Sequence, residues 1–583
     1  MPPLRLTCAT PPVMVRLPIR HLMSQRRLLV LAALFVSPVV ARAAEPTVPT
    51  ERPKLAVIIS VDQLRGDYLT KFRPYFGEGG FKRLLDGGAE FRDTHYRHSI
   101  TQTAPGHATI LTGVHANVHG VTSNDWTDRV SWEQVNSVED RDSPLVGINP
   151  AELGPAAAAN PAKTGRSPRN LKADTVGDML KARYGTDSKV FAASNKDRSA
   201  ILLGGRKGDA AYWDENGKMV TSRHYREKLP AWVEAFNAER RAQQAFGQTW
   251  DRIADPKLYD QLQGPDDAVG EYEGNGFKRT MPKTVTGGKG TITPAFFEAF
   301  DVSPFSAEFL GAFVERAVKE EKLGRNRATD VLGVSFSQID SCGHMYGPDS
   351  HEIMDSMLRL DRVLARLLDT IDREVGLAHC LIVITADHGV LPVPEQTQAK
   401  LGPDAAGRTN LGEVDAAIKQ ALDAAYGPLG ARESWFMRDN SGYHLRPAAL
   451  AAKNVSAAEA AKVARGAMVA LPYMAEVYTR EELLAIDPDG TSVASMMRRS
   501  YRAESDRDLV FVLKAFFMPG SRAVGTTHGS PYAYDTHVGH LWYGPGILPA
   551  VRGERVGVDD IAPTLAGLLG VPVPNHAPGR RLL

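Results

Sequence analysis

The sequence has few cysteines and almost no excess of charge, and both features narrow the class of protein. Only three cysteines occur in 583 residues, and none stands in a CxxC pair. A disulfide-rich scaffold and a structural zinc knuckle are therefore excluded. Lysine and arginine total 69 against 68 acidic residues, a formal net charge of +1. This balance leaves no excess of positive charge to attract nucleic acid, so we expect no nucleic-acid partner.

Internal repeats and long low-complexity tracts are also missing. Hydrophobic residues make up 43% and charged residues 23% of the chain, which is typical of a packed globular protein. A length of 583 residues accommodates one large α/β domain and a second, smaller unit.

One apolar run near the N-terminus is too short to span a bilayer comfortably. Arg26 and Arg27 precede the apolar stretch 28–40, which ends at an Ala-Arg-Ala cleavage site. This order is typical of a signal peptide, so we predict that residues 1–43 are removed and that no stable membrane span remains. The mature protein is then periplasmic or secreted. A start at Met23 and an uncleaved membrane anchor stay open.

Apolar runs separated by helical stretches predict an α/β fold. Near-continuous apolar runs, which suit strands buried on both faces, occupy residues 54–62, 331–340 and 381–389, and residues 540–547 resemble a last core strand. Residues 354–371 repeat apolar side chains at helical spacing. We expect an α/β fold class with a mixed, mostly parallel central sheet and helices on both faces.

The domain organisation follows from changes in composition. Residues 50–583 are expected to form one large domain, into which residues of about 400–500 insert an α+β cap, because that range is rich in alanine and contains short strands such as SGYHLRP. Residues 127–170 and 206–300 are predicted to be irregular, since they depart from the alternation of strands and helices.

Six aspartate and histidine side chains border the predicted strands in four separate places. They are Asp62, Asp340, His344, Asp387, His388 and His528. Ligands in α/β sheets gather at the carboxyl ends of strands, so we expect these side chains to converge. Taken singly, most of them are better explained as a turn, a cap or a satisfied polar residue. The Asp387-His388 pair is a stronger signal, because it follows an apolar run and precedes Gly389. The number and placement of all six favour a pair of divalent ions, and three imidazoles favour zinc over magnesium.

A threonine in the segment SITQTAPGHATILTG is the predicted nucleophile. A hydroxyl attacks poorly at neutral pH, but a divalent ion beside it lowers its pKa. We assign this role to Thr103, with Thr101 as the rival and with helix capping as the simpler alternative. Pro105 and Gly106 are expected to turn the chain ahead of a helix whose N-terminus faces an anion.

Three further side chains are predicted to hold phosphoryl oxygens. Asn124 lies in VTSNDW, and Lys196 and Arg198 lie two residues apart in SNKDRSA. On an extended segment the two cations project to one side, where they neutralise the two charges of a phosphate monoester. On this short motif alone, a solvated surface pair is the simpler interpretation.

Taken in order, these motifs resemble the alkaline phosphatase superfamily. The likeness is to its PafA-like branch, the phosphate-irrepressible bacterial alkaline phosphatases with a threonine nucleophile. The matching segments are SVDQLRGDYL, TQTAPGHATILTG, SNDW, NKDR, QIDSCGH, TADHG and GTTHGSPYAYDTHVGHLWYGPG, which span nearly all of the predicted mature chain. The resemblance implies an alkaline-phosphatase-like fold and an alkaline phosphomonoesterase that works through two zinc ions and a covalent phosphothreonine.

The resemblance also implies a role for each motif residue. The zinc on the nucleophile side would be bound by Asp62, Thr103, Asp387 and His388. The zinc on the leaving-group side would be bound by Asp340, His344 and His528, with His537 as the less favoured third histidine. Asn124, Lys196 and Arg198 match the phosphate-binding set of the monoesterases.

Two other functions stay open. A phosphodiesterase or nucleotide pyrophosphatase of the same superfamily would share the metal ligands, but its relatives lack a pair like Lys196 and Arg198. A non-catalytic exported protein that binds metal or phosphate would keep the ligands without turnover. The expected partners are small phosphate monoesters, and no oligomeric state is predicted.

Overall fold

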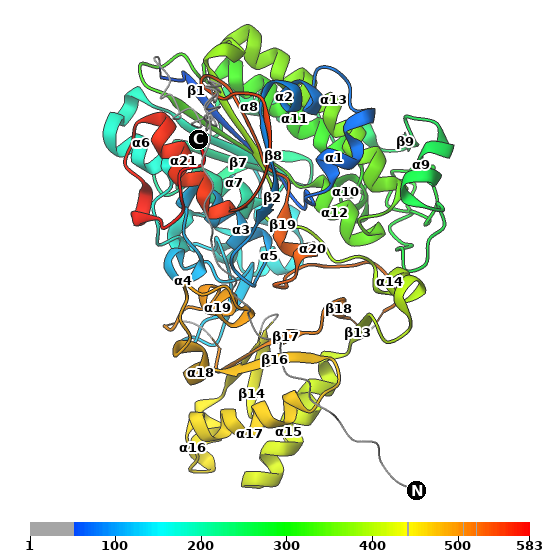
Figure 1. The fold of residues 1–583 in the computed structure, drawn as a ribbon, viewed down its shortest axis with the longest axis vertical. Coiled ribbons are helices and arrows are strands. Elements are labelled where there is room, and N and C mark those ends of the chain that lie inside the picture. The colour runs from blue at the N-terminus through cyan, green and yellow to red at the C-terminus, as the bar shows by residue number, and fades with distance from the viewer. Residues whose placement is uncertain (1–51, 440–441, 505–506, 521) are drawn as a thin grey trace, which may run out of the picture. The chain divides into compact units, whose positions relative to one another are not determined.

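The computed structural model describes residues 52–439, 442–504, 507–520 and 522–583 and is organised around one large mixed sheet (Figure 1). Its strands run in the order β19-β2-β20-β12-β1-β11-β6-β7-β8-β5, with β21 paired to β2. They are β1 (Leu55–Val61), β2 (Ala89–His95), β5 (Leu145–Val146), β6 (Val190–Ser194), β7 (Ala210–Glu215), β8 (Lys218–Ser222), β11 (Asp330–Phe336), β12 (Cys380–Thr385), β19 (His537–Val538), β20 (Leu541–Tyr543) and β21 (Ala550–Gly557).

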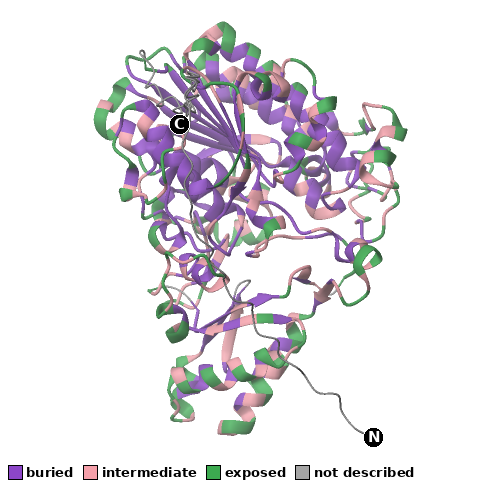
Figure 2. Ribbon diagram, in the orientation of Figure 1, coloured by how far each residue is buried: buried purple, intermediate pink, exposed green. Residues whose placement is uncertain are grey.

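The centre of this sheet is parallel and fully buried. β1 pairs in parallel with β11 on one side and with β12 on the other, and β11 pairs in parallel with β6. Every residue of β1, β11 and β12 is buried, as expected for apolar strands that helices cover on both faces (Figure 2). The three strands predicted from apolar runs are confirmed.

The outer part of the sheet is antiparallel, and one prediction there is wrong. β20, which lies in the run 540–547, pairs antiparallel with β12. It is not the last core strand, because β21 follows it and pairs in parallel with β2. The predicted fold class, a mixed and largely parallel sheet with helices, is confirmed.

Helices pack on the sheet in two groups. α11 (Pro304–Glu320) packs against α13 (His351–Glu374), which confirms the helix predicted over 354–371. α3 (Thr103–Thr112) packs against α7 (Asp197–Gly204), and α7 also contacts β6, β7 and β11. In Figure 1 the two groups lie on opposite sides of the sheet.

A four-stranded antiparallel sheet is separate from the large one. It has the order β14-β15-β17-β16, formed by β14 (Phe436–Asp439), β15 (Gly442–Leu445), β17 (Leu509–Leu513) and β16 (Met474–Thr479). With α15 (Leu411–Tyr426) and α17 (Ala457–Val469) it encloses a hydrophobic cluster of its own, which includes Trp435. This unit falls in the range in which a cap is expected; that it acts as a cap stays a prediction.

The range 206–300 is more regular than predicted. It contains β7 and β8 as well as α8 (Ala231–Ala238), α9 (Pro256–Gln263) and α10 (Pro294–Val302). Prolines open α9 and α10, where proline is tolerated because the first helical N–H needs no intrahelical acceptor.

Two of the three cysteines lie in the described part of the chain. Cys342 and Cys380 are buried and unpaired. The predicted signal peptide, residues 1–43, lies outside the described residues. Within the ranges that are described, no helix combines the length and apolarity needed to cross a bilayer.

Candidate active site

Two adjacent parallel strands bring the first predicted ligands together. Asp62 directly follows β1, and Asp387 and His388 follow β12. The backbone N–H of Asp62 also donates to Phe336 O, at the end of β11, over 3.0 Å. The ends of three neighbouring strands therefore meet where these side chains lie.

Asp340 and His344 lie on a helix, which corrects the prediction that residues 331–340 form one strand. β11 ends at Phe336, and α12 (Gln338–Tyr346) follows after a single residue. Residues four apart share one face of a helix. Accordingly, His344 Nε2 lies 3.3 Å from Asp340 Oδ1.

Asp340, His344 and His528 form one candidate metal group. His528 lies in the loop between β18 (Phe517–Pro519) and α20 (Ala533–Thr536), and its Nε2 is 3.6 Å from Asp340 Oδ1. One ligand atom from each of the three residues lies within 4.8 Å of the others. The Nδ1 atoms of His344 and His528 lie 2.9 Å and 2.7 Å from the carbonyl oxygens of Thr526 and Thr101. These bonds leave each Nε2 free to face a metal.

A second group surrounds His388. Its Nε2 lies 3.4 Å from Asp62 Oδ1 and 3.4 Å from Asp387 Oδ2. All three atoms are buried, and in the described part of the chain none has a hydrogen-bond partner. Unpaired polar atoms cost free energy in the interior, and a divalent cation between them would remove that cost. These residues therefore fit a metal ion. Asp340 also lies within 4.8 Å of Asp62 and His388, so the two groups adjoin.

Burial and crowding shift the pKa values of these ligands. Burial raises the pKa of the Asp62 carboxyl well above its ordinary value, and the charges of Asp340 and Asp387 add to the increase. Burial lowers the pKa of His528 well below its ordinary value, with a further contribution from His388. A neutral imidazole is the form that binds a metal, and a cation would relieve the repulsion between the carboxylates.

Thr103 is the first residue of α3 and is buried, with an exposed fraction of 1%. The helix predicted after it is confirmed, but Pro105 and Gly106 lie within its first turn instead of turning the chain ahead of it. Proline is tolerated there because the first N–H groups of a helix have no intrahelical acceptor. A Cβ on Gly106 would lie 2.2 Å from Asp387 O, so the close approach of α3 to the ligand segment requires glycine. The rival Thr101 donates its hydroxyl to Ser530 O over 2.9 Å.

The predicted phosphate-binding side chains lie beside these ligands, although in a different local structure. Lys196 precedes α7 and Arg198 lies in its first turn, so the predicted extended segment is wrong. Lys196 Nζ donates to Asp62 Oδ2 over 2.7 Å and to Asp340 Oδ2 over 2.5 Å. Asn124 accepts a hydrogen bond of 2.8 Å from the N–H of Ala104, next to Thr103.

Among the described residues, the Arg198 guanidinium has a nitrogen that is available for a further hydrogen bond. Its guanidinium lies 3.8 Å from the carboxylate of Asp197, and among the described residues its buried Nε has no hydrogen-bond partner. A buried guanidinium nitrogen without an acceptor is a candidate anion contact.

Two residues beside the ligands stand in contacts that no sequence pattern indicated. Gln63 Nε2 donates to Asp340 Oδ1 over 2.7 Å, and the Gln63 N–H donates to Asp387 Oδ1 over 3.2 Å. His107 Nδ1 lies 2.8 Å from Thr103 O and 3.3 Å from Asp387 Oδ2. Adjacency to Asp62 was the one available signal for Gln63.

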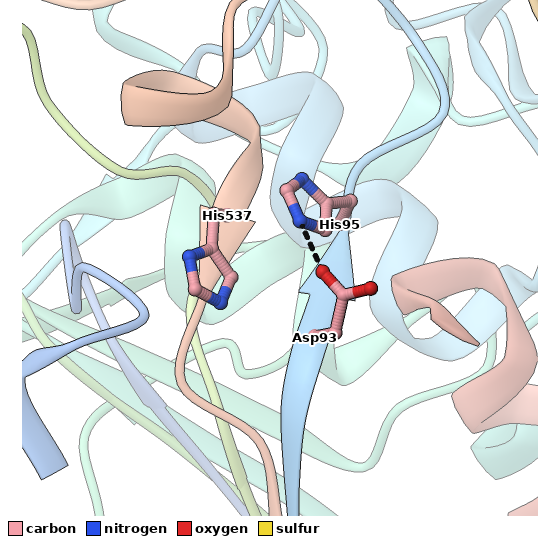
Figure 3. A group of neighbouring side chains, drawn as sticks. All are labelled: Asp93, His95 and His537. Atoms are coloured by element: carbon pink, nitrogen blue, oxygen red, sulfur yellow. Dashed lines mark hydrogen bonds and ion pairs between the residues drawn. The ribbon is translucent and has the colours of Figure 1, made fainter. Parts of the chain in front are cut away.

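A third cluster contains His537 and differs from the first two (Figure 3). His95 Nε2 lies 2.9 Å from Asp93 Oδ1, and its Nδ1 lies 3.0 Å from Thr536 Oγ1. His537 Nε2 is 2.7 Å from Arg92 O. The two imidazole rings stack at 4.7 Å with an interplanar angle of 11°, so their nitrogens do not point at a common centre. This geometry favours His528 as the partner of Asp340 and His344.

Comparisons with known proteins agree with this geometry. A family model described as type I phosphodiesterase / nucleotide pyrophosphatase matches residues 56–465. Alkaline phosphatase PhoV of Synechococcus elongatus is 30% identical over 542 residues, which cover 91% of this chain and 92% of PhoV. Alkaline phosphatase PafA of Elizabethkingia meningoseptica is 30% identical over 549 residues, which cover 92% of this chain and 95% of PafA. A crystal structure of PafA matches with a TM-score of 0.83 at 28% identity and covers 91% of this chain and 98% of that one.

The fold and the clustered ligands define a hydrolase of the alkaline phosphatase superfamily. The chain belongs to the type I phosphodiesterase / nucleotide pyrophosphatase family, and the predicted resemblance to its PafA-like alkaline phosphatases is confirmed.

Proposed function

We propose that this protein is a periplasmic or secreted alkaline phosphomonoesterase that uses two zinc ions and Thr103 as its nucleophile. The observation that carries the proposal is the position of Lys196, whose ammonium lies within 2.7 Å of Asp62 and 2.5 Å of Asp340. A cation among the ligand carboxylates, with Asn124 beside Thr103, suits a phosphoryl group that carries two charges.

The ligand sets follow the two candidate groups. One zinc would be held by Asp62, Thr103, Asp387 and His388, and the other by Asp340, His344 and His528. When bound, such ions lower the pKa of a hydroxyl and stabilise a departing oxygen. Three imidazoles among the ligands favour zinc.

The protein's own groups position the reacting atoms. Thr103 Oγ1 gives up its proton to solvent and forms a bond to phosphorus while the bond from phosphorus to the ester oxygen breaks. The ester oxygen departs with that electron pair and takes a proton from water to become the alcohol. The ten-residue helix α3 starts at Thr103, so the positive end of its dipole lies beside the proposed nucleophile and favours an anion there. Lys196, Arg198 and Asn124 orient the phosphoryl oxygens. Water then cleaves the phosphothreonine and releases phosphate.

A phosphodiesterase is the second candidate, because the matching family model is named for that activity. A diester has one negative charge fewer and one substituent more, so it gains less from Lys196 and Arg198. A non-catalytic metal-binding or phosphate-binding protein would not need a threonine at the start of α3.

The deciding experiment compares phenyl phosphate with diphenyl phosphate at alkaline pH, using the zinc-loaded chain and a chelator control. We expect monoester hydrolysis to dominate and to disappear with the chelator. A Lys196→Ala, Arg198→Ala variant should lose monoesterase activity far more than residual diesterase activity. Preference for the diester would move the protein to the diesterases, and zinc binding without turnover on either ester would make it a binding protein.

A further inference from the structure

A cavity of about 710 Å³, part of it open to solvent, adjoins the candidate active site. Gln102 and His528 line one end of it, and β17 and β18 supply the facing wall. Gln102 Oε1 also accepts hydrogen bonds of 2.9 Å from Ser123 Oγ and from the N–H of Asn124. The cavity therefore includes His528, proposed to lie beside the leaving oxygen, and Gln102, which contacts Asn124.

The wall opposite the ligands is mainly apolar. It is formed by Phe511 and Leu513 of β17 and by Phe517 and Met518 of β18. Among the described residues that line the cavity, none is a lysine or an arginine. Asp535 is the one acidic residue in the lining, and its Oδ2 accepts hydrogen bonds of 2.8 Å and 2.6 Å from the N–H and the hydroxyl of Ser530. Such a surface binds hydrocarbon groups and gives no compensation for additional negative charge.

Hydrogen bonds hold this wall against the loop that carries His528. The Tyr532 hydroxyl donates to Leu513 O over 2.8 Å, and the Phe516 N–H donates to the Tyr534 hydroxyl over 3.2 Å. The rings of Phe516 and Tyr534 also pack at 5.2 Å. The apolar wall and the His528 loop are thus joined at several points, as a preformed subsite requires.

We propose that this cavity binds the alcohol portion of the phosphate ester and selects alcohols that carry an apolar alkyl or aryl group. The inference rests on the proposed function, in which the leaving oxygen lies next to His528. An alcohol that extends past His528 enters the cavity, where each buried methylene group contributes to the binding free energy. Polyhydroxy alcohols gain nothing from an apolar wall. Alcohols that bear further phosphates gain nothing either, because no described lysine or arginine lines the cavity.

The test is a series of methyl, butyl and hexyl phosphate with glycerol phosphate as the polar comparison. Simple alkyl alcohols have similar acidities, so binding governs differences along the series. Each buried methylene is expected to raise kcat/KM by up to about fourfold. We expect hexyl phosphate to exceed both methyl phosphate and glycerol phosphate by at least about tenfold. Calorimetric titration with hexylphosphonate and methylphosphonate should give the same order without depending on turnover.

A truncated wall with a matched control completes the test. Phe517→Ala should lower kcat/KM for hexyl phosphate by about tenfold while methyl phosphate changes by less than about twofold. The control is Phe305→Ala, because Phe305 is also partly buried but lies on α11 and lines a different hollow. A flat alkyl series, or equal binding of the two phosphonates, would overturn the cavity assignment and leave the phosphatase intact. Failure to hydrolyse methyl phosphate and every other ester would overturn the proposed function itself.

Discussion

The carboxamide of Gln63 donates a 2.7 Å hydrogen bond to Oδ1 of Asp340, the oxygen that faces His344 and His528. Gln63 adopts a positive φ of 69°, which is uncommon for a residue with a side chain. A Cβ on Gly343 would lie 1.8 Å from Gln63 Oε1, so glycine at this position of α12 leaves space for the carboxamide. The orientation of a candidate metal ligand therefore depends on a residue from another segment.

Loss of this hydrogen bond should weaken metal binding. Gln63→Leu removes the donor that orients Asp340, and we expect the affinity for zinc to fall about 10- to 100-fold. Competition with a chromogenic chelator measures this affinity. Gln248→Leu is the matched control, since Gln248 donates to Gln244 O on the exposed surface. An unchanged affinity in Gln63→Leu would show that Asp340 needs no such support.

Removal of the proposed nucleophile should separate metal binding from chemistry. Thr103→Ala should retain both zinc ions, form no phosphoenzyme and lose at least about a thousandfold in kcat, as loss of a nucleophile does elsewhere. Mass spectrometry of the intact protein after acid quenching detects the phosphoenzyme. Thr101→Ala serves as the comparison. Normal turnover by Thr103→Ala would transfer the role to Thr101.

The buried ion pair between Lys283 on β10 (Lys283–Thr284) and Glu352 on α13 should contribute strongly to the free energy of unfolding. Lys283 Nζ lies 2.8 Å from Glu352 Oε1, and both side chains are fully buried. Lys283→Ala leaves a buried carboxylate without its partner, so we expect a loss of about 3–5 kcal/mol. Lys218→Ala breaks the exposed pair with Glu152 and should cost less than about 1 kcal/mol. Urea denaturation compares the two, and similar losses would refute the distinction.

The stability of the protein should decrease between about pH 5 and pH 9 through Glu271. Burial raises the pKa of the Glu271 carboxyl, and the charge of Glu352 raises it further. A raised folded-state pKa gives stability that is complete below the ordinary glutamate pKa and declines as the pH rises through the folded-state value. Glu271→Gln carries no charge to bury. It should gain about 1 kcal/mol or more relative to the wild type between pH 5 and pH 9. Thermal unfolding at several pH values measures this, and parallel curves would contradict it.

The sequence predicted the central strands better than it predicted the local structure around the candidate ligands. β1, β11 and β12 stand out because a strand buried on both faces needs an unbroken apolar run. The same run could not show where β11 ends, so Asp340 was expected on a strand although it lies on α12. Lys196 and Arg198 were placed on an extended segment for a similar reason, since three residues carry no periodicity.

Other features depend on contacts between distant segments and have no signal in the sequence. A single glutamine such as Gln63 forms no pattern, and its role follows from its contacts with Asp340 and Asp387. The cavity beside His528 combines residues from the loop before α3, from β17 and β18, and from the segment 527–535. No local property of these segments predicts that they share one hollow.

The contact between Gly106 and the carbonyl of Asp387 fixes the spacing between the proposed nucleophile and its metal ligands through the main chain alone. A distance that is set by backbone atoms does not change when the surrounding apolar side chains are exchanged. Core residues of such a protein can therefore be substituted while the distance between the reacting groups stays the same. Substitutions that alter the reaction itself should therefore concentrate at this glycine, at the candidate ligands and at the residues proposed to hold the phosphoryl group, and substitutions elsewhere in the core should act on stability.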